Sequence, residues 1–284
     1  MTTVVTLDVF SGLPNPSLQL SDVDERELHD RLAVATTMTH ERPSGVVGGL
    51  GYRGFLISSH DPTMTAAGTL RVHEGLVDRG ISLANVVDNT EIERFLLGKF
   101  KPRLGQDVHD HVHAGIASVT QFGAAAAPAA CPQCDAADAP VYNPAPWNNP
   151  TVQPHNNCYN YANDQITNTF AQPGRAHGQQ ATVMDCAHVQ AGAVADGLAV
   201  AAHGFGGPLA PGQGWYVALV IWPGADYHWY RQDKNGCWSH KPGQTAARNV
   251  DNAGHTISDP NRCNRGPYTI FCDYMVTKRG LSIA

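Results

Sequence analysis

The stretch HNNCYNYANDQ, residues 155–165, predicts a loop that becomes a helix at a cysteine. Asn157 is a suitable N-cap, because its side-chain oxygen can accept a hydrogen bond from an unpaired backbone N–H group of the first turn. Cys158 would then lie in that turn, where the positive end of the helix dipole favours a thiolate over a thiol. The stretch therefore predicts a cysteine nucleophile, and the rest of the chain must supply its base.

The composition narrows the class of protein. The chain has 284 residues, enough for one large domain or two ordinary ones, and its hydrophobic content of 42% is typical of globular proteins. It contains no run of eighteen apolar residues that would predict a membrane span. The net charge is −6 and no basic patch is present. We therefore expect neither a membrane nor a nucleic acid as partner.

The N-terminal sequence and the cysteines indicate the cellular compartment in which the protein resides. The first residues, MTTVVTL, have no basic region and no long apolar core, so they predict a cytoplasmic protein without a secretory signal. Six of the seven cysteines could form disulfides in an oxidising compartment, whereas in the cytosol they would be thiols or metal ligands. Cys263 and Cys272 flank a loop and could pair. The sequence does not determine the pairing.

Residues 1–122 predict a small α+β domain. Strands are expected at 3–10 and 69–77, a helix from Ser21 to about Ala35, and a second helix opened by a capping box at Thr90. The glycine-rich segment before Phe55 matches neither a Walker A motif nor a dinucleotide fingerprint, which favours a turn that feeds a strand. No catalytic constellation occurs in this half.

A histidine cluster keeps metal binding open as an alternative function. His109, His111 and His113 would share one face of an extended strand, and three imidazoles suit zinc, copper or nickel. Neighbours on one strand face fan out, however, which favours an exposed strand end. Cys131 and Cys134, in a CPQC motif, are further candidate ligands. They lie in residues 123–146, which predict an irregular linker.

Residues 147–284 predict a second domain around a buried sheet. The apolar run 215–222 predicts a central strand, and a strand at 268–276 closes the domain. Asn235-Gly236 predicts a hairpin between strands at 227–233 and 237–243, with Arg231 opposite His240. Helices are expected at 158–170 and 187–202. His228, at the start of its strand, could reach a helix terminus and act as the base for Cys158.

This order resembles the papain-like thiol hydrolases, which include NlpC/P60-type amidases and bacterial effector peptidases. The resemblance rests on Cys158 in NNCYNYA and His228 in DYHWY, and it covers about residues 147–280. It implies an α+β domain in which a central helix packs on an antiparallel sheet. It also implies a cysteine-dependent hydrolase or acyl transferase that acts on an amide or thioester bond.

The resemblance assigns roles to further residues. Papain has an oxyanion-hole glutamine six residues before its cysteine; here Val152 occupies that position and Gln153 follows it. Asn157, Gln153 or Asn156 could donate to the oxyanion with the Cys158 backbone N–H group. Polar residues downstream of His228 could orient it, and four are candidates: Asp233, His240, Asn249 and Asp251.

We select His240 and Asp251 as the candidates for the third residue of a catalytic triad. The substrate-binding residues that we expect are Gln153, Asn156, Tyr159 and Trp229. The expected substrate is a small molecule or peptide, and no cofactor or metal is expected. Besides the metal-binding alternative, the chain could be a non-catalytic binding module in which Cys158 is buried. The distance between Cys158 and His228 separates the hydrolase from both alternatives.

Overall fold

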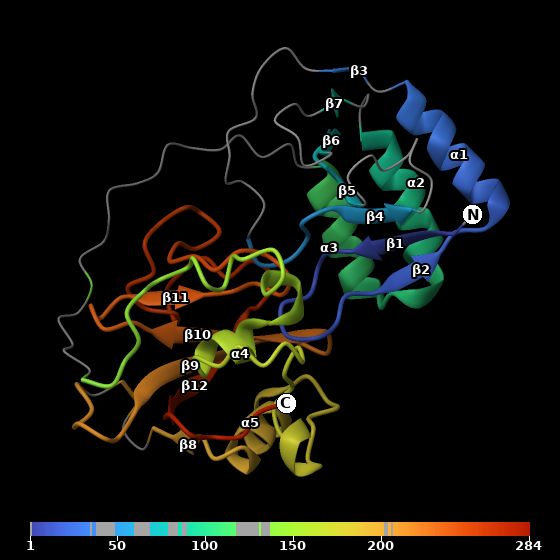
Figure 1. Cartoon of the computed structure of the whole chain (residues 1–284). Helices are drawn as coiled ribbons and strands as arrows, with labels where there is room; N and C mark the ends of the chain where they lie inside the picture. The colour runs from blue at the N-terminus through green and yellow to red at the C-terminus, as the bar shows by residue number, and fades with distance from the viewer. Residues whose placement is uncertain are drawn as a thin grey trace. The chain divides into compact units, whose positions relative to one another are not determined.

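The computed structural model describes residues 2–34, 36–37, 49–59, 69–78, 85–86, 90–117, 131, 137–201, 204–205 and 207–284. They form two compact units (Figure 1). Unit 1 comprises Met1–Val9, Asn15–Val47 and Gly51–Phe122, and unit 2 comprises Phe10–Pro14, Gly48–Leu50 and Gly123–Ala284. Both contain helices and antiparallel strands, so the predicted α+β class is confirmed. No helix in the described ranges is long and apolar enough to cross a membrane.

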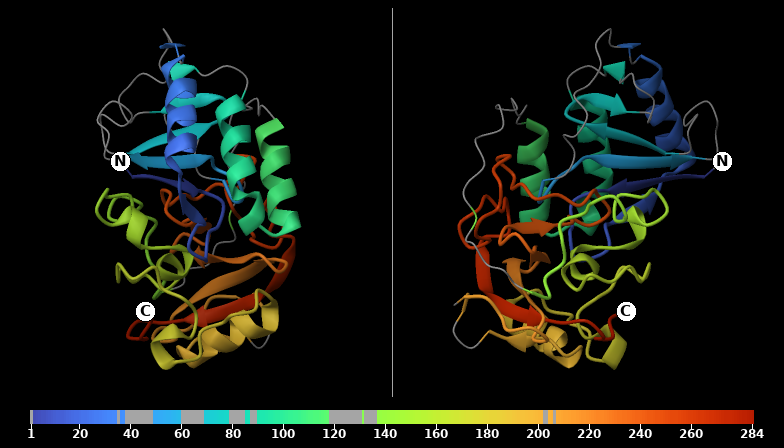
Figure 2. Two further views of the ribbon diagram at one scale, coloured as in Figure 1. Left: turned by 90° about the vertical axis from the view of Figure 1, so that its right-hand side faces the viewer. Right: turned by 60° about the vertical axis from the view of Figure 1, so that its left-hand side comes forward.

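Unit 1 contains an antiparallel sheet with the strand order β2-β1-β4-β5-β6-β7-β3. Its strands are β1 Thr3–Leu7, β2 Ser17–Gln19, β3 Thr36–Thr37, β4 Phe55–Ser59, β5 Thr69–His73, β6 Leu76–Asp78 and β7 Asn85–Val86. Its helices are α1 Asp22–Ala33, α2 Glu91–Phe100, the 3-10 helix η2 Lys101–Arg103, and α3 Gln106–Ala117. The helices lie along one face of the sheet (Figure 2), where the rings of Phe55 and Phe100 are 5.8 Å apart. The predicted strand at Phe55 is confirmed.

A buried ion cluster holds the end of β1. The Asp8 carboxylate accepts hydrogen bonds from Arg53 at 2.7 Å and from Arg71 at 2.8 Å. Burial alone would raise the pKa of Asp8, but the two guanidinium groups outweigh it and hold this pKa well below its usual range.

Helix caps in unit 1 are predicted correctly in one case and wrongly in the other. Ser21 caps α1, because its hydroxyl accepts from the Asp24 N–H group. Thr90 has a φ of 62° and makes no side-chain cap, so the predicted capping box is wrong. Glu93, its expected partner, is buried and accepts instead from the Tyr52 hydroxyl at 2.6 Å and the Gly75 N–H group at 2.7 Å.

The histidine cluster lies in helix α3, not on a strand. At helical spacing the rings of His109 and His113 stack 6.3 Å apart, whereas His111 accepts a hydrogen bond from the Tyr52 N–H group. The three imidazoles therefore do not converge. Among the described residues, no group of three or more His, Cys, Asp or Glu side chains is placed to hold a metal ion.

Unit 2 contains an antiparallel sheet with the strand order β11-β10-β9-β12-β8. Its strands are β8 Ala199–Val200, β9 Trp215–Trp222, β10 Asp226–Gln232, β11 Trp238–His240 and β12 Ile270–Thr277. Its helices are α4 Cys158–Ala162, α5 Cys186–Ala195 and the 3-10 helices η3 Gln153–His155 and η4 Arg175–His177. All residues of β9 are buried, which confirms the predicted central strand.

The two faces of this sheet carry different side chains, because successive residues of a strand point to opposite faces. The helix face is covered by α4 and α5 and carries Trp215, Val217, Leu219, Ile221, Tyr227, Trp229 and Met275. The loop face carries Tyr216, His228, Tyr230, Trp238, His240 and Tyr274, and several of these rings contact one another.

Helix α4 is five residues long, not thirteen as predicted. It ends because Asp164 adopts a φ of 53°, which does not continue a right-handed helix. The Asn163 side-chain amide donates to the Tyr159 carbonyl at 2.9 Å, and the Trp215 indole donates to the Ala162 carbonyl at 2.9 Å. These bonds satisfy carbonyls that a longer helix would have used.

The hairpin forms at Asn235-Gly236 but one residue out of the predicted register. The Asp233 N–H group donates to the Cys237 carbonyl, and Gly236 has a φ of 81°, so the connection is a three-residue loop. His240 consequently lies opposite Tyr230 rather than Arg231. A slip of one residue moves a side chain to the other face, and here it places His240 on the loop face.

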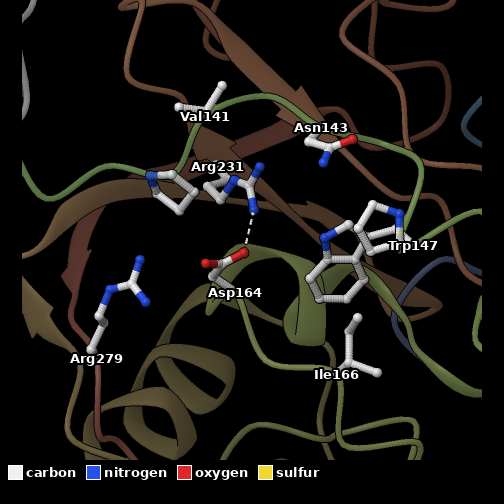
Figure 3. A pocket seen from close by; sticks show the side chains of 9 residues that line it. Val141, Asn143, Trp147, Asp164, Ile166, Arg231 and Arg279 are labelled. Carbon is white, nitrogen blue, oxygen red and sulfur yellow. Dashed lines mark hydrogen bonds and ion pairs between the residues drawn. The ribbon is translucent and has the colours of Figure 1, made fainter.

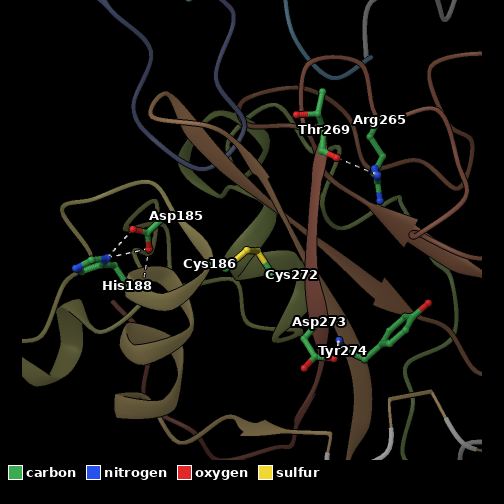
Figure 4. Close-up of a disulfide and its surroundings, with 8 residues drawn as sticks. All are labelled: Asp185, Cys186, His188, Arg265, Thr269, Cys272, Asp273 and Tyr274. Carbon is green, nitrogen blue, oxygen red and sulfur yellow. Dashed lines mark hydrogen bonds and ion pairs between the residues drawn. A yellow bond between two sulfur atoms is a disulfide. The ribbon is translucent and has the colours of Figure 1, made fainter.

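Two disulfides staple unit 2. Cys186, at the start of α5, is bonded to Cys272 in β12 (Figure 4). Cys131 is bonded to Cys237. The ladder between β12 and β9 shifts register between Phe271 and Asp273, and this bulge lets Cys272 reach α5. The suggested pairing of Cys263 with Cys272 is therefore wrong, and Cys263 is a free thiol. Cys134 lies outside the described residues.

Candidate functional site

Cys158 begins helix α4 as predicted, and Asn157 caps it. The Asn157 side-chain oxygen accepts from the N–H groups of Tyr159 and Asn160, and the Asn160 side chain accepts in return from the Asn157 N–H group. This reciprocal arrangement is a capping box. The local structure expected from the sequence therefore forms.

The thiol itself does not have the predicted character. Cys158 is fully buried among apolar side chains of the helix face. Burial, followed by the nearby Asp226 carboxylate, raises the pKa of Cys158 far above its usual range. The helix has only five residues, and its N-terminus does not offset this burial. Cys158 is thus a protonated core thiol at neutral pH.

His228 does not form the predicted catalytic pair with Cys158. Trp229, the next residue of β10, packs on Tyr159 of α4 with ring centroids 5.5 Å apart. His228 points to the opposite side of the strand, where its ring lies 4.8 Å from Tyr230 and 5.8 Å from Tyr268. Cys158 and His228 are therefore separated by the sheet.

His228 pairs with His240 instead. Nε2 of His240 lies 3.1 Å from the Val250 carbonyl, which can only accept, so this nitrogen carries a hydrogen. Nδ1 of a neutral His240 is then an acceptor, and Nε2 of His228 donates to it at 2.9 Å. Both imidazoles are buried. His240, predicted as the residue that orients a catalytic base, thus links β10 and β11 to the segment at Val250.

Asp251 organises a turn rather than a catalytic triad. Its Oδ1 atom accepts from the N–H groups of Ala253 and His255, each at 2.9 Å. Its Oδ2 atom accepts from the Asn264 N–H group at 2.9 Å. Three backbone groups therefore occupy the carboxylate, and none of these bonds goes to His228, the expected partner.

The predicted oxyanion and substrate-binding residues also hold the fold together. The Asn157 amide donates to the carbonyls of Gly12 and Ala171, so it is not available to an oxyanion. Asn156 donates to the Val152 carbonyl, and the Gln153 amide donates to the Gln244 carbonyl. These bonds tie loops to one another.

Tyr159 and Trp229, the two aromatic candidates for substrate binding, are both fully buried on the helix face. The Tyr159 hydroxyl donates to Asp196 at 2.9 Å. Neither ring is exposed to a substrate, because each packs against the other within the core.

Lys241 and Asp226 are two buried charged groups that the sequence-based prediction missed. The Lys241 ammonium is fully buried and donates to the carbonyls of Gln153, Asn156 and Gly243 at 2.5–2.7 Å. It therefore fastens the segment before α4 to the end of β11. Nothing in the local sequence distinguishes this lysine from an exposed one.

The second missed group is Asp226, which accepts from the N–H groups of Ser11, Gly12 and Leu13 and from the Tyr268 hydroxyl. Burial raises the pKa of Asp226, and these hydrogen bonds oppose the rise. A Cβ atom at Gly12 would lie 2.5 Å from the Tyr227 ring, so only glycine fits there. The turn-forming residues after position 10 indicate backbone N–H groups that need an acceptor, but they do not indicate that Asp226 is this acceptor.

Comparison with known proteins changes the functional assignment. No family model matches the chain, and no solved structure matches it. Insoluble matrix shell protein 1 of Ruditapes philippinarum is 47% identical over 136 residues, which are 47% of this chain and 87% of that protein. That relative is named as a matrix protein and not as a protease.

This finding overturns two predictions. The cysteine hydrolase or acyl transferase, with its thiol-protease assignment, is wrong: the relative is a matrix protein, and the buried Cys158 is separated from His228. The cytoplasmic location is wrong as well, because disulfides persist in oxidising compartments and unit 2 contains two of them. The identity and coverage of the match show that this chain belongs to the family of insoluble matrix shell protein 1.

Proposed function

We propose that the chain is an extracellular structural protein that assembles into an insoluble matrix and has no catalytic activity. The observation that carries this proposal is the 47% identity to a protein named for an insoluble shell matrix, over 87% of that relative. Sequence similarity of this extent places the two proteins in one family, and a shared structural role is the simplest function for this chain.

The packing of unit 2 supports a structural role. Strands β9, β10 and β11 of its sheet are buried on both faces, and two disulfides connect segments 86 and 106 residues apart. Cross-links over such distances restrict the unfolded chain strongly, which suits a protein that persists outside the cell. The polar groups nominated for catalysis are engaged in hydrogen bonds within the fold.

Fractionation of a producing organism tests this function. We expect the chain in the extracellular insoluble material, with the Cys186–Cys272 disulfide intact, and its release by denaturant but not by salt. A cytosolic marker protein, followed in the same samples, controls for leakage. Recovery of the chain mainly with that marker, in reduced form, would refute the proposal.

We also propose that unit 2 retains the architecture, but not the chemistry, of the papain-like proteins. Supporting this is a helix that begins at Cys158 and packs on an antiparallel sheet whose strand β10 carries His228. An experimental structure of the chain tests the idea. Superposition of α4, β9, β10 and β12 on a papain-like core in the same order supports it, and a different strand order contradicts it.

A further inference from the structure

Unit 2 contains an open pocket of about 420 Å³ that is lined by both charged and apolar side chains (Figure 3). Its volume falls within the range of small-ligand sites. Arg231 of β10 and Asp164, which follows α4, meet in it, and Arg279 enters from another side of Asp164. The proline-rich segment that contains Asn143 forms a further wall.

The polar centre of the pocket is held by several contacts of Arg231. Arg231 is 1% exposed and donates to Asp164 at 3.0 Å and to Asp233 at 2.9 Å. Its guanidinium group also lies 4.1 Å from the centre of the Tyr161 ring. A buried guanidinium fixed by two carboxylates and an aromatic face holds Asp164 in one position. The carboxylate is therefore positioned before any ligand arrives.

Hydrogen-bonding capacity remains at the mouth of the pocket. Asp164 accepts a hydrogen bond from Arg231 through Oδ1 alone, and its side chain is 27% exposed. Its Oδ2 atom can therefore accept a hydrogen bond from a ligand. Arg279 is exposed, and its charge acts on the nearby Asp164 carboxylate. Asn143 uses its oxygen to accept from the Ala145 N–H group, which leaves its amide nitrogen as a donor.

Charges of both signs lie at the pocket. Arg231 pairs with Asp164, which lines the pocket, and with Asp233, which does not, and Arg279 is a further lining residue. An anionic ligand would therefore meet Asp164, and a cationic ligand would meet Arg279. A neutral ligand is repelled by neither Asp164 nor Arg279. Hydroxyl groups suit this pair of residues, because each hydroxyl can donate a hydrogen bond to a carboxylate and accept one from a guanidinium group.

Apolar side chains stand beside these polar groups. Val141 is 67% exposed and Ile166 is 42% exposed, both unusually high for large hydrophobic residues, and both line the pocket with Pro146. Exposed apolar side chains that gather around convergent polar groups mark a binding site. A sugar ring has the matching surface, with C–H groups on its faces and hydroxyl groups at its edge.

We propose that this pocket binds a neutral saccharide. A ring hydroxyl donates to Oδ2 of Asp164 and accepts from Arg279, and the Asn143 amide donates to a second oxygen. The C–H face of the ring packs on Ile166 and Val141. Arg231 touches no sugar and acts by positioning Asp164. The site is argued from unit 2 alone and does not depend on assembly into a matrix.

Calorimetric titration of the full disulfide-bonded chain tests the proposal with two probes, the β-1,4-linked tetramers of glucose and of N-acetylglucosamine. We expect at least one to bind with a dissociation constant of about a millimolar or lower. Asp164→Asn keeps the acceptor for Arg231 but replaces the acceptor for the sugar, and Arg279→Ala removes a donor. Each should weaken binding about tenfold.

Arg262→Ala is the matched control, because Arg262 is 88% exposed, pairs with Asp259 and does not line the pocket. It should leave binding unchanged. Failure of both tetramers to bind, or equal binding by Arg279→Ala and the wild type, would overturn the proposal. Tighter binding of a hexaglutamate peptide than of either sugar would also overturn it, since the site would then select anions. Neither result bears on the extracellular location, which fractionation tests.

Discussion

The helix face and the loop face of the sheet in unit 2 use the same strands for different chemistry. On the helix face, Cys158 packs among apolar and aromatic side chains such as Trp229. On the loop face, His228 and His240 form a hydrogen-bonded pair between aromatic rings. A cysteine and a histidine that appear well placed for catalysis along the chain are thus kept apart by a single strand. The face to which a side chain points decides whether two reactive groups can meet.

The largest effect is expected from truncating the helix face. Trp229→Ala should lower the free energy of unfolding by about 3–5 kcal/mol, because it removes a fully buried indole and leaves a cavity beneath α4. Trp238→Ala, on the loop face, should cost less, since β11 has three residues at the sheet edge and the loops there can collapse. Urea unfolding measures both. A larger loss for Trp238→Ala would contradict the ranking of the two faces.

The next effect concerns the cross-link between α5 and the sheet. Replacing both Cys186 and Cys272 by alanine should lower the free energy of unfolding by about 2–4 kcal/mol, because the disulfide closes a long loop. Thermal unfolding with and without a reducing agent checks this. The double variant should be less sensitive to the reductant than the wild type, and equal sensitivity would show that this disulfide contributes little.

On the loop face, His240→Leu should cost about 1–3 kcal/mol. It leaves the His228 Nε2–H group and the Val250 carbonyl without the partners described above. His255→Ala provides the control, because the His255 side chain is exposed and its loss should change stability by no more than about 0.5 kcal/mol. Equal stability of the two variants would mean that the histidine pair is not structural.

The smallest effect is a pH dependence that arises from Cys158. Its folded-state pKa is raised above the ordinary value of 9.0, so the unfolded chain loses this proton first as the pH rises. The stabilisation from the protonated buried thiol is complete below about pH 8 and decreases above pH 9, by at most about 1.4 kcal/mol per pH unit. Cys158→Ala lacks this slope. Unfolding curves for both proteins should therefore converge at alkaline pH, and parallel pH profiles would refute the burial of the thiol.

Some local features were predictable from the sequence, although the Thr90 cap and the length of α4 were not, and the distant pairings were not predictable. The buried strand β9, the Ser21 cap and the Asn157 cap each depend on neighbouring residues, and all three are confirmed. The register of His240 depended on a three-residue loop where a two-residue turn was expected. That difference of one residue decides on which face His240 lies.

Pairings across long separations depended on features without a local signal. Cys186 reaches Cys272 because β12 has a bulge there, and the sequence does not mark that bulge. Asp226 binds backbone groups more than two hundred residues earlier in the chain. Function was misjudged for a related reason: the helix-start cysteine was correct as local structure, but its burial is a property of the whole fold.

Alkylation of the native protein with iodoacetamide near pH 8, mapped by mass spectrometry, tests most directly whether Cys158 is a core residue or a nucleophile. Cys263 provides an internal reference, because it is half-buried and burial raises its pKa to about 11. We predict that Cys158 stays unmodified in the folded chain, where Cys263 reacts faster, and that Cys158 reacts only after denaturation. Labelling of native Cys158 faster than Cys263 would contradict the account, because it would reveal an accessible thiolate where the structure has a buried thiol.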